Sequence, residues 1–577
     1  MPILSKRYLR YLPYILLFVF LEKSVIFGPW HQSSFPFKRK ADHIRSHSSL
    51  RAWLRANNLE YVDEYDHVVV NVGRMQCFHL GDWWSHCAVK DELKPQNSAE
   101  VQRKIIRKDL LGAKTFGFSD YLFYDTLSIY SISQLEDNDQ KEQVLLTAVS
   151  EQQSPDSQKV YNFYVNFVPL QVEYLTNGTP IISDFNVLFG DDCVDPRNNW
   201  ELDKSWILYR GQFPSYLSIR RLSAKHIEDW HPRLTVREDG TYKIVQLADL
   251  HFSVGKGECR DEFPKHDFCE ADPKTIKFVE EVLDLEEPDM VVFTGDQIMG
   301  DRAVQDSETA LLKAVAPVIK RRIPWAMVWG NHDDEGSLSR WSLSKFANGL
   351  PYSLFTISPR DTKDNTFGVG NYYHQILDYE KKYPVLTFYF LDSHKYSTTG
   401  KIFPGYDWIK EAQWDYLEKI YDEELYHHIK EIPAYHLSMA FFHIPLPEYL
   451  NEASKRNPGE SNPIIGNAKE GVTAPKYHSN GVDSLVHMNV QATSCGHDHC
   501  NDYCLLDDSS TSKLWLCYGG AVGEGGYGGY GGYERRIRMY QFQTKQGNIY
   551  TWKRLNGSPI NYFDYQPLAL GGVSSTG

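Results

Sequence analysis

The sequence predicts an α/β domain preceded by a smaller, β-rich domain. After residue 240, strand-like runs alternate with segments of helical spacing, whereas short aromatic and β-branched runs dominate before it. The chain has 577 residues, more than one core normally organises, so we expect two globular units with appendages. Its apolar fraction of 42% supports packed cores and excludes a chain that is disordered throughout.

The first segment, residues 1–30, is predicted to be a signal-anchor. Basic residues at 6, 7 and 10 precede an apolar run at 11–21, and no small-x-small cleavage site follows. This run suits a signal peptide but is short for a membrane span, which needs roughly 20 residues. The alternative is a peripheral hydrophobic tail on a cytoplasmic protein. Residues 31–58 are basic and serine-rich, which predicts a linker.

Residues 59–235 are predicted to form the β-rich domain. Runs at 67–72, 160–168 and 206–209 combine aromatic and β-branched residues, which suit pleated strands. The charged stretch 136–142 is expected to be a loop.

Residues 236–560 are predicted to form the α/β domain, and 561–577 a C-terminal tail. Strands are expected at 242–248, 290–294 and 325–329, with helices at 273–285 and 307–319 between them. This order predicts parallel strands joined by crossover helices. Further strands are expected at 385–391, 436–442, 514–518, 536–543 and 549–555. The Gly/Tyr-rich stretch 519–533 lies between two of them and is expected to form a loop at the rim of a site.

The cysteines and the net charge limit the possible partners. Nine cysteines cannot all pair within one chain, although Cys259 and Cys269 are close enough to form a local disulfide. The cluster of Cys495, Cys500, Cys504 and Cys517 predicts buried thiols, with a zinc site as the alternative. Sequons at Asn177 and Asn556 matter only if the chain enters the secretory pathway.

The net charge of −14 argues against a nucleic-acid partner, which needs a basic face.

Polar residues follow five predicted strands of the α/β domain, at the ends where open α/β sheets bind ligands. In chain order these residues are Asp249 and His251, Asp296, Asn331 to Asp333, His443, and His497 with His499. Any one of these motifs alone is better explained as a turn at a strand end. The ordered set of five is far more specific.

This set suits a pair of metal ions. Two divalent cations about 3.5–4 Å apart can hold a phosphate and an activated water in line, with the pKa of the water lowered toward about 7. Such a pair needs mixed oxygen and imidazole ligands, including a carboxylate able to bridge. Glycines at 295, 330 and 496 are expected to let the backbone turn sharply beside the ligands.

Over roughly 240–560 the pattern resembles the calcineurin-like metallophosphoesterase superfamily. The resemblance implies a β-sandwich flanked by helices (αββα) and a dinuclear centre of iron, manganese or zinc. It implies that Asp249, His251 and His499 hold the first metal, that Asn331, His443 and His497 hold the second, and that Asp296 bridges them. It also implies that His332 is a general acid or stabilises the leaving oxygen. Asp333, or Asp334, would orient this histidine.

Finer motifs resemble the fungal dosage-dependent cell cycle regulator phosphatases, which are relatives of purple acid phosphatases. These motifs begin at Trp329, Phe390, Phe442 and Gly523. The purple enzymes place a tyrosine ligand where this chain has Met299, and they lack the histidine found here at His251. A colourless centre is therefore expected.

The resemblance implies a phosphatase that acts on phosphoproteins, in cell-cycle or stress signalling. One alternative is a luminal phosphodiesterase that removes ethanolamine phosphate from lipid-linked glycans. Another is a catalytically silent binding protein. The predicted signal-anchor places the catalytic domain in the lumen of the endoplasmic reticulum or vacuole, with the cytoplasm as the alternative location.

Overall fold

A computed structural model describes most of the chain from residue 66 to 575. Within that range it leaves out 82–83, 94–99, 113–115, 136–142, 177–178, 223–233, 359–365, 452–464, 508–512 and 530–533. Before it, only 52 and 54–56 are described, so the predicted signal-anchor and nearly all of the linker lie outside the described residues, as does the loop predicted at 136–142. The chain divides into two compact units, Met1–Glu60 and Tyr61–Gly577. Among the described residues, no helix has the length and apolarity needed to cross a bilayer.

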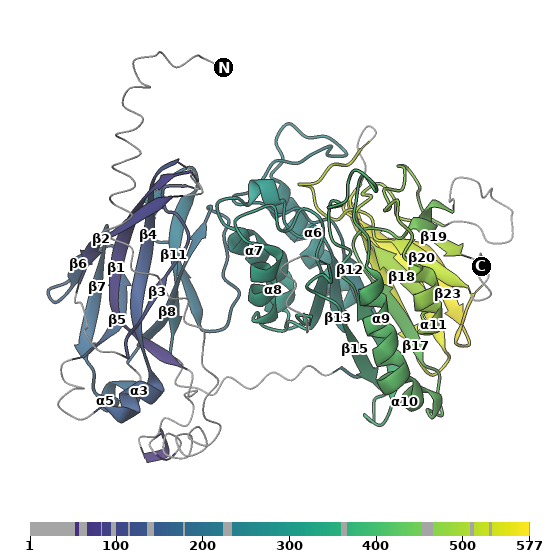
Figure 1. Cartoon of the computed structure of the whole chain (residues 1–577), viewed down its shortest axis with the longest axis horizontal. Coiled ribbons are helices and arrows are strands. Elements are labelled where there is room, and N and C mark those ends of the chain that lie inside the picture. The colour runs from purple at the N-terminus through teal and green to yellow at the C-terminus, as the bar shows by residue number, and fades with distance from the viewer. Residues whose placement is uncertain are drawn as a thin grey trace, which may run out of the picture. The chain divides into compact units, whose positions relative to one another are not determined.

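The first part of the larger unit is built mainly of strands, as predicted (Figure 1). One antiparallel sheet has the order β2-β1-β4-β3, from Ser85–Glu92, His67–Leu80, Phe116–Ser128 and Gln102–Ile105. A second has the order β10-β11-β8, from Tyr209–Arg210, Pro214–Arg221 and Ile182–Phe189, with β9 (Trp200–Asp203) also paired to β11. A third has the order β5-β7-β6, from Val144–Ser150, Phe163–Pro169 and Gln158–Val160. Two short helices, α3 (Ile129–Gln134) and α5 (Val172–Thr176), complete this part. Of the strand predicted at 206–209, only Tyr209 lies in a strand, as the first residue of β10.

The α/β part begins with the three parallel strands that the sequence predicts. These are β12 (Thr241–Leu247), β13 (Met290–Thr294) and β14 (Trp325–Val328). All residues of β13 and β14 are buried, as expected for central parallel strands covered on both faces. The sheet continues through antiparallel strands in the order β14-β13-β12-β21-β22-β23-β24. Strands β21 to β24 span Arg536–Gln543, Asn548–Leu555, Ser558–Leu570 and Val573–Ser574.

A second sheet of six strands packs face to face on the first. Its order is β15-β16-β17-β18-β20-β19, from Tyr372–Leu377, Pro384–Phe390, Leu437–Phe441, Ala492–Cys495, Leu514–Tyr518 and Cys504–Asp507. The ring of Phe388 on the second sheet lies 5.9 Å from Tyr242 and 5.1 Å from Phe542, which both belong to the first. Aromatic and branched side chains from both sheets therefore share one buried core.

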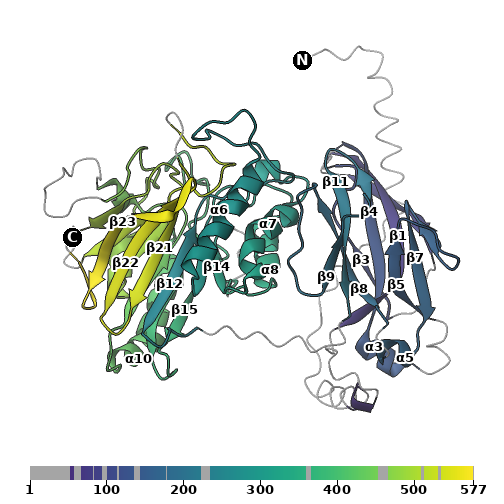
Figure 2. The same cartoon turned by 180° about the vertical axis from the view of Figure 1, so that it is seen from behind.

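Helices cover the outer faces of the two sheets. Helices α6 (Ala271–Glu286), α7 (Ser307–Lys320) and α8 (Arg340–Asn348) contribute to the core of the first sheet (Figure 2). Helices α9 (Glu411–Ile420) and α11 (Gly481–His487) pack with the second sheet in a separate cluster, and α10 (Tyr426–Lys430) follows α9. The predicted sandwich flanked by helices is confirmed.

The far C-terminus and the cysteines differ from expectation. The tail predicted at 561–577 instead includes most of β23 and all of β24, which extend the first sheet.

The predicted Cys259–Cys269 disulfide is present. Cys504 and Cys517 are also bonded, as a cross-strand pair, so neither a four-cysteine zinc site nor four free thiols is present; Cys495 and Cys500 are buried and free. A third disulfide joins Cys77 and Cys87.

Buried ion pairs connect the β-rich part to the α/β part within the larger unit. Lys313 on α7 is fully buried and donates to Asp192, which follows β8, at 2.6 Å and to Asp272 on α6 at 2.5 Å. It also donates to the carbonyl of Gly255 at 2.7 Å. The Gly255 carbonyl belongs to the loop after β12, so this network fixes that loop against α7. Moving the loop away would be costly, because it would leave a buried charge with fewer partners.

Candidate metal centre

The seven predicted ligands come together at the carboxyl ends of β12, β13, β14, β17 and β18. Asp249 and His251 follow β12, Asp296 follows β13, Asn331 follows β14, His443 follows β17, and His497 and His499 follow β18. All seven side chains are buried. The set therefore draws on both sheets of the sandwich, and the structure brings all seven predicted residues together.

One half of the cluster forms around His251 and His499. Their Nε2 atoms lie 3.0 Å apart, and His499 Nε2 is 3.6 Å from Asp249 Oδ1. Asp296 Oδ2 lies 3.8 Å from His251 Nε2. These spacings suit donors that converge on one ion.

The other half forms around His443. Its Nε2 lies 3.1 Å from Asn331 Oδ1 and 3.3 Å from His497 Nδ1. The same Asp296 Oδ2 is 3.4 Å from His443 Nε2. Asp296 thus stands between the two groups, which is the position that a bridging carboxylate requires. Asp249 is close to both groups: its carboxylate lies within 4.8 Å of the ligand atoms of His251 and His499, and also of those of Asp296 and His443.

The hydrogen bonds of the histidines show that the cluster presents acceptors to its centre. His443 Nδ1 lies 2.9 Å from the carbonyl oxygen of Thr294, and His499 Nδ1 lies 2.8 Å from that of Tyr527. A carbonyl only accepts, so each Nδ1 carries a proton, and in the neutral form of each imidazole Nε2 offers a lone pair. Lone pairs and carboxylate oxygens that face one another at these distances need a cation between them, so the residues present fit metal ions.

The pKa directions show that the carboxylates of the cluster attract positive charge, which is a proton on His443 when no metal ion is bound. Burial opposes the charged form of His443, but the carboxylates of Asp296 and Asp249 outweigh it and raise the pKa of His443 to about 9. The cavity thus attracts positive charge. Burial holds the pKa of His497 and that of His499 well below the usual value, which keeps both imidazoles neutral and ready to bind a metal.

The backbone at the ligands is strained. Asp249, His251, Asp296 and His497 all have φ between +50° and +76°, a region that costs L-residues roughly 1–2 kcal/mol each. Backbone hydrogen bonds hold these turns, including one from His251 N–H to the Asp296 carbonyl at 2.9 Å. Such strain, concentrated on one set of side chains, is typical of a functional site.

The glycines beside the ligands have two different functions. Gly295 has φ +93°, so it makes the expected turn. Gly330 does not have a positive φ. It is needed because a Cβ there would lie 2.1 Å from Asp296 Oδ1. Gly496 is similar, with a Cβ placed 2.7 Å from Asp249 Oδ2. At 330 and 496, where φ is not positive, close approach to a carboxylate is the reason that the structure gives for glycine.

His332 lies beside the cluster, and its partner is not the predicted one. Its Nδ1 is 2.6 Å from Glu335 Oε2, and both side chains are 32% exposed. Burial opposes the imidazolium, but Asp296 and Glu335 outweigh it and raise the pKa of His332. Among the described residues, Nε2 of His332 has no hydrogen-bond partner.

Asp333 has a different function from the one expected. Its buried carboxylate accepts backbone N–H groups from Gly330 at 2.7 Å, Asp296 at 3.0 Å and Ile298 at 3.1 Å. It therefore fixes the loops that hold Asp296 and Asn331 instead of orienting His332, because its short side chain points into the backbone. Asp334 pairs with Lys395 at 2.7 Å.

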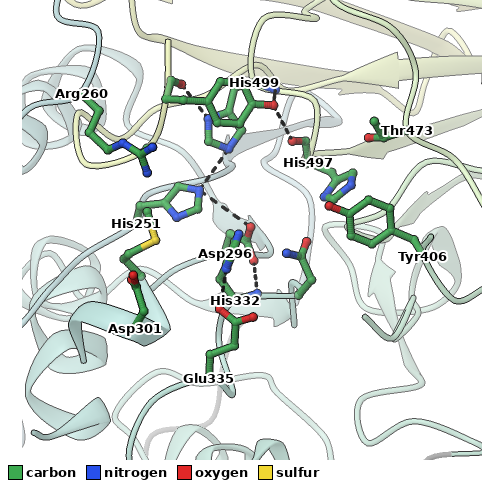
Figure 3. A pocket seen from close by; sticks show the side chains of 14 residues that line it. His251, Arg260, Asp296, Asp301, His332, Glu335, Tyr406, Thr473, His497 and His499 are labelled. Carbon is green, nitrogen blue, oxygen red and sulfur yellow. Dashed lines mark hydrogen bonds and ion pairs between the residues drawn. The ribbon is translucent and has the colours of Figure 1, made fainter. Parts of the chain in front are cut away.

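A cavity of about 270 Å³ opens over the cluster (Figure 3). Several residues that line it were not named individually as site residues in the sequence analysis. These are Arg260, Met299, Asp301, Glu335, Tyr406, Thr473, Gly526 and Tyr527. Tyr527 stacks on His499 with ring centroids 3.9 Å apart, and the edge-to-face ring of Tyr406 lies 4.3 Å from His497. Gly526 and Tyr527 confirm that the Gly/Tyr-rich stretch forms a rim. Glu335 belongs to the family-like motif that begins at Trp329, and Tyr527 to the one that begins at Gly523, so the sequence offered a signal for both. No sequence pattern pointed to Tyr406 or Thr473.

Comparison with known proteins identifies the family. The calcineurin-like phosphoesterase model matches residues 242–501, which include all seven predicted ligands. Phosphatase DCR2 of Saccharomyces cerevisiae is 51% identical over 584 residues, covering 99% of this chain and 98% of that one. Probable inactive purple acid phosphatase 28 of Arabidopsis thaliana is 34% identical, covering 58% of this chain and 85% of that one.

Solved structures that resemble the chain carry related descriptions. A dimetal phosphatase from Danio rerio matches with a TM-score of 0.37 at 13% identity, covering 57% of this chain and 99% of that one. Purple acid phosphatase PPD1 from yellow lupin matches with a TM-score of 0.34 at 10% identity, covering 87% of this chain and 72% of that one. The assignment rests on the sequence relatives and the family model. The chain belongs to the calcineurin-like metallophosphoesterases, within a group that includes fungal phosphatase DCR2 and purple acid phosphatase homologues, and it is a phosphatase.

Proposed function

We propose that the chain hydrolyses phosphate monoesters on phosphoproteins with the help of two metal ions. The observation that supports this most is the buried cluster of seven imidazole, carboxyl and amide side chains with Asp296 between its halves, open to a cavity that His332 also lines. When bound, two cations in such a site supply charge neutralisation for the phosphoryl group and activation of the attacking water. Iron, manganese and zinc all suit these ligands.

The protein's own residues would perform the remaining steps. Asp296 accepts the backbone N–H of His332 at 2.9 Å, which fixes the histidine next to the cluster. With Nδ1 held by Glu335, His332 can give the proton on Nε2 to the departing oxygen. A serine or threonine alkoxide is a poor leaving group and needs this proton. The pair therefore supports a phosphoprotein substrate, and cell-cycle or stress signalling as its setting rests on the resemblance to the fungal group.

We also propose a luminal, membrane-associated location. Three disulfides among the described residues, Cys77–Cys87, Cys259–Cys269 and Cys504–Cys517, favour an oxidising compartment over the cytoplasm. The same observation favours the second candidate, a luminal phosphodiesterase acting on ethanolamine phosphate. A silent binding protein is the least supported, because every predicted ligand is in place, although some relatives are named as inactive.

The deciding experiment compares purified protein on a phosphoserine peptide and on a phosphodiester, with bound metals measured in the same sample. Faster turnover of the peptide supports the monoesterase. Faster turnover of the diester would favour the second candidate, and metal-loaded protein inactive on both would favour the third.

A further inference from the structure

The side chain of Arg260 lines the cavity over the metal cluster. Figure 3 shows its guanidinium reaching toward His251, across the cavity from Tyr406. We propose that Arg260 is a substrate-binding residue whose guanidinium holds an anionic oxygen of the substrate beside the metal ions. This inference rests on the proposed phosphatase function.

The backbone of Arg260 is fixed from two sides. Its N–H donates to the carbonyl of Glu524 at 2.9 Å, and its own carbonyl accepts from Arg535 Nη2 at 2.7 Å. Arg535 is buried and also donates to the carbonyl of Tyr527, whose ring stacks on His499. Arg260 is therefore attached to the same rim that supports a predicted ligand.

The loop that contains Arg260 is closed on itself. The disulfide Cys259–Cys269 joins its ends and begins at the residue next to Arg260. The Gly255 carbonyl before it is held by the buried Lys313. A side chain on a closed loop with a fixed backbone loses less conformational freedom when it binds a ligand, so its contact is stronger for the same chemistry.

Three charged neighbours of Arg260 in the sequence have polar partners. Asp261 accepts the N–H of Gly528 at 3.0 Å. Glu262 pairs with Lys274 at 2.7 Å, and Lys256 with Glu270 at 2.8 Å. Within the described part of the chain, the guanidinium of Arg260 makes no hydrogen bond or ion pair. Besides His332, the other charged residues of the cavity wall outside the cluster are Asp301 and Glu335, which are acidic, so Arg260 is the one described wall residue with a permanent positive charge.

Arginine suits this task because its planar fork can donate two parallel hydrogen bonds to a phosphate or a carboxylate. The anionic oxygen has two possible sources: the scissile phosphate itself, or a second acidic group of the substrate next to it. Both involve the same chemistry at Arg260, and kinetics can distinguish them.

The test compares Arg260→Ala with wild type on three substrates. These are nitrophenyl phosphate, a phosphoserine peptide with neutral flanking residues, and the same peptide with acidic flanking residues. The matched control is Lys265→Ala, which removes a positive charge from the same disulfide-closed loop at an exposed position that does not line the cavity. Arg260→Lys tests whether the fork or only the charge matters.

We expect Arg260→Ala to raise KM about tenfold with kcat and metal content nearly unchanged, which is the size of one charge-assisted hydrogen bond at a partly exposed site. Equal increases on all three substrates identify the scissile phosphate as the anion. An increase confined to the acidic peptide identifies a second acidic group. Lys265→Ala should match wild type throughout. If Arg260→Ala also matches wild type on every substrate, the inference is wrong.

Calorimetric binding of non-hydrolysable phosphonate analogues of the two phosphopeptides to the metal-loaded proteins repeats the comparison without catalysis. Wild type that binds them more tightly than Arg260→Ala, yet hydrolyses none of the three substrates, would contradict the proposed function and support the role of Arg260. Hydrolysis by wild type with equal affinity in the two proteins would contradict only the role of Arg260.

Discussion

Replacement of Glu335 by glutamine tests whether this residue sets the protonation of His332. Glutamine keeps the length of the side chain and an acceptor oxygen, but it removes the charge that lies 2.6 Å from His332 Nδ1. If His332 is the general acid, it works only while protonated. Glu335 raises the pKa of His332, so its loss should lower that pKa, and activity on the alkaline side should disappear at a lower pH.

The size of the shift follows from the exposure of the pair. Both side chains are 32% exposed, so solvent screens the interaction and the contribution stays near the upper end of the range for surface pairs, about 1 kcal/mol. One pKa unit corresponds to about 1.36 kcal/mol, which gives a shift of roughly 0.7 unit. We expect the alkaline limb of kcat on phosphoserine peptide to move down by about that amount.

The assay records kcat against pH for wild type, Glu335→Gln and Asp301→Asn. Asp301→Asn removes an exposed carboxylate from the wall of the same cavity without touching His332, so it controls for the general loss of negative charge. An alkaline limb that stays in place in Glu335→Gln, or that moves equally in Asp301→Asn, would refute the reasoning.

Four further predictions follow from the same structure. His332→Ala should lose roughly 10²–10⁴-fold in turnover on phosphoserine peptide, with less loss on an aryl phosphate and near-normal metal content; equal loss on both substrates would mean that it only positions phosphate. Asp296→Ala should lose both metals by elemental analysis, because it removes the bridge, whereas His499→Ala should lose mainly one; unchanged metal content in Asp296→Ala would contradict the bridging role. Gly330→Ala should also lose metal, because its Cβ would displace the Asp296 carboxylate. Wild-type metal content in this variant would show that the loop moves enough to accept the methyl group. Glycosidase should shift the gel mobility of wild type but not of Asn177→Gln, because the amide of the other sequon residue, Asn556, is engaged by Glu524 at 2.8 Å; no shift in wild type would argue against a luminal domain.

Much of the α/β fold could be predicted from sequence because its central strands are continuous buried runs. The strand at Met290–Thr294 could be predicted from its composition, because a short apolar run between two helical segments is typical of a central strand. All five of its residues are buried in the structure. Strand β18, Ala492–Cys495, was expected before Gly496 but without bounds, because its four small residues have little strand propensity and are ordered by their neighbours β17 and β20. Strand β23 was missed because it is mostly half-buried or exposed and contains two prolines, so its pattern resembles a tail.

The residues of the site also include some that the sequence predicts and some that only the folded structure reveals. The seven predicted ligands could be proposed together because each follows a strand, and the carboxyl ends of strands from both sheets meet at one edge of the sandwich. The partner of His332 could not be predicted, because three acidic residues follow it in Asp333, Asp334 and Glu335, and only the turn decides which one points back. Arg260 and Tyr406 enter the cavity from loops whose course depends on tertiary contacts, so no local pattern marked them.

The central claim is that these residues form a dinuclear phosphatase site, and simultaneous metal analysis and activity measurement test it most directly. The full chain would be purified, its bound iron, manganese and zinc quantified, and phosphate release from a phosphoserine peptide followed as metal is removed by chelation and restored. We predict close to two metal ions per chain, with activity lost on removal and regained on addition. Full activity in metal-free protein, or in protein that holds only one ion, would contradict the account.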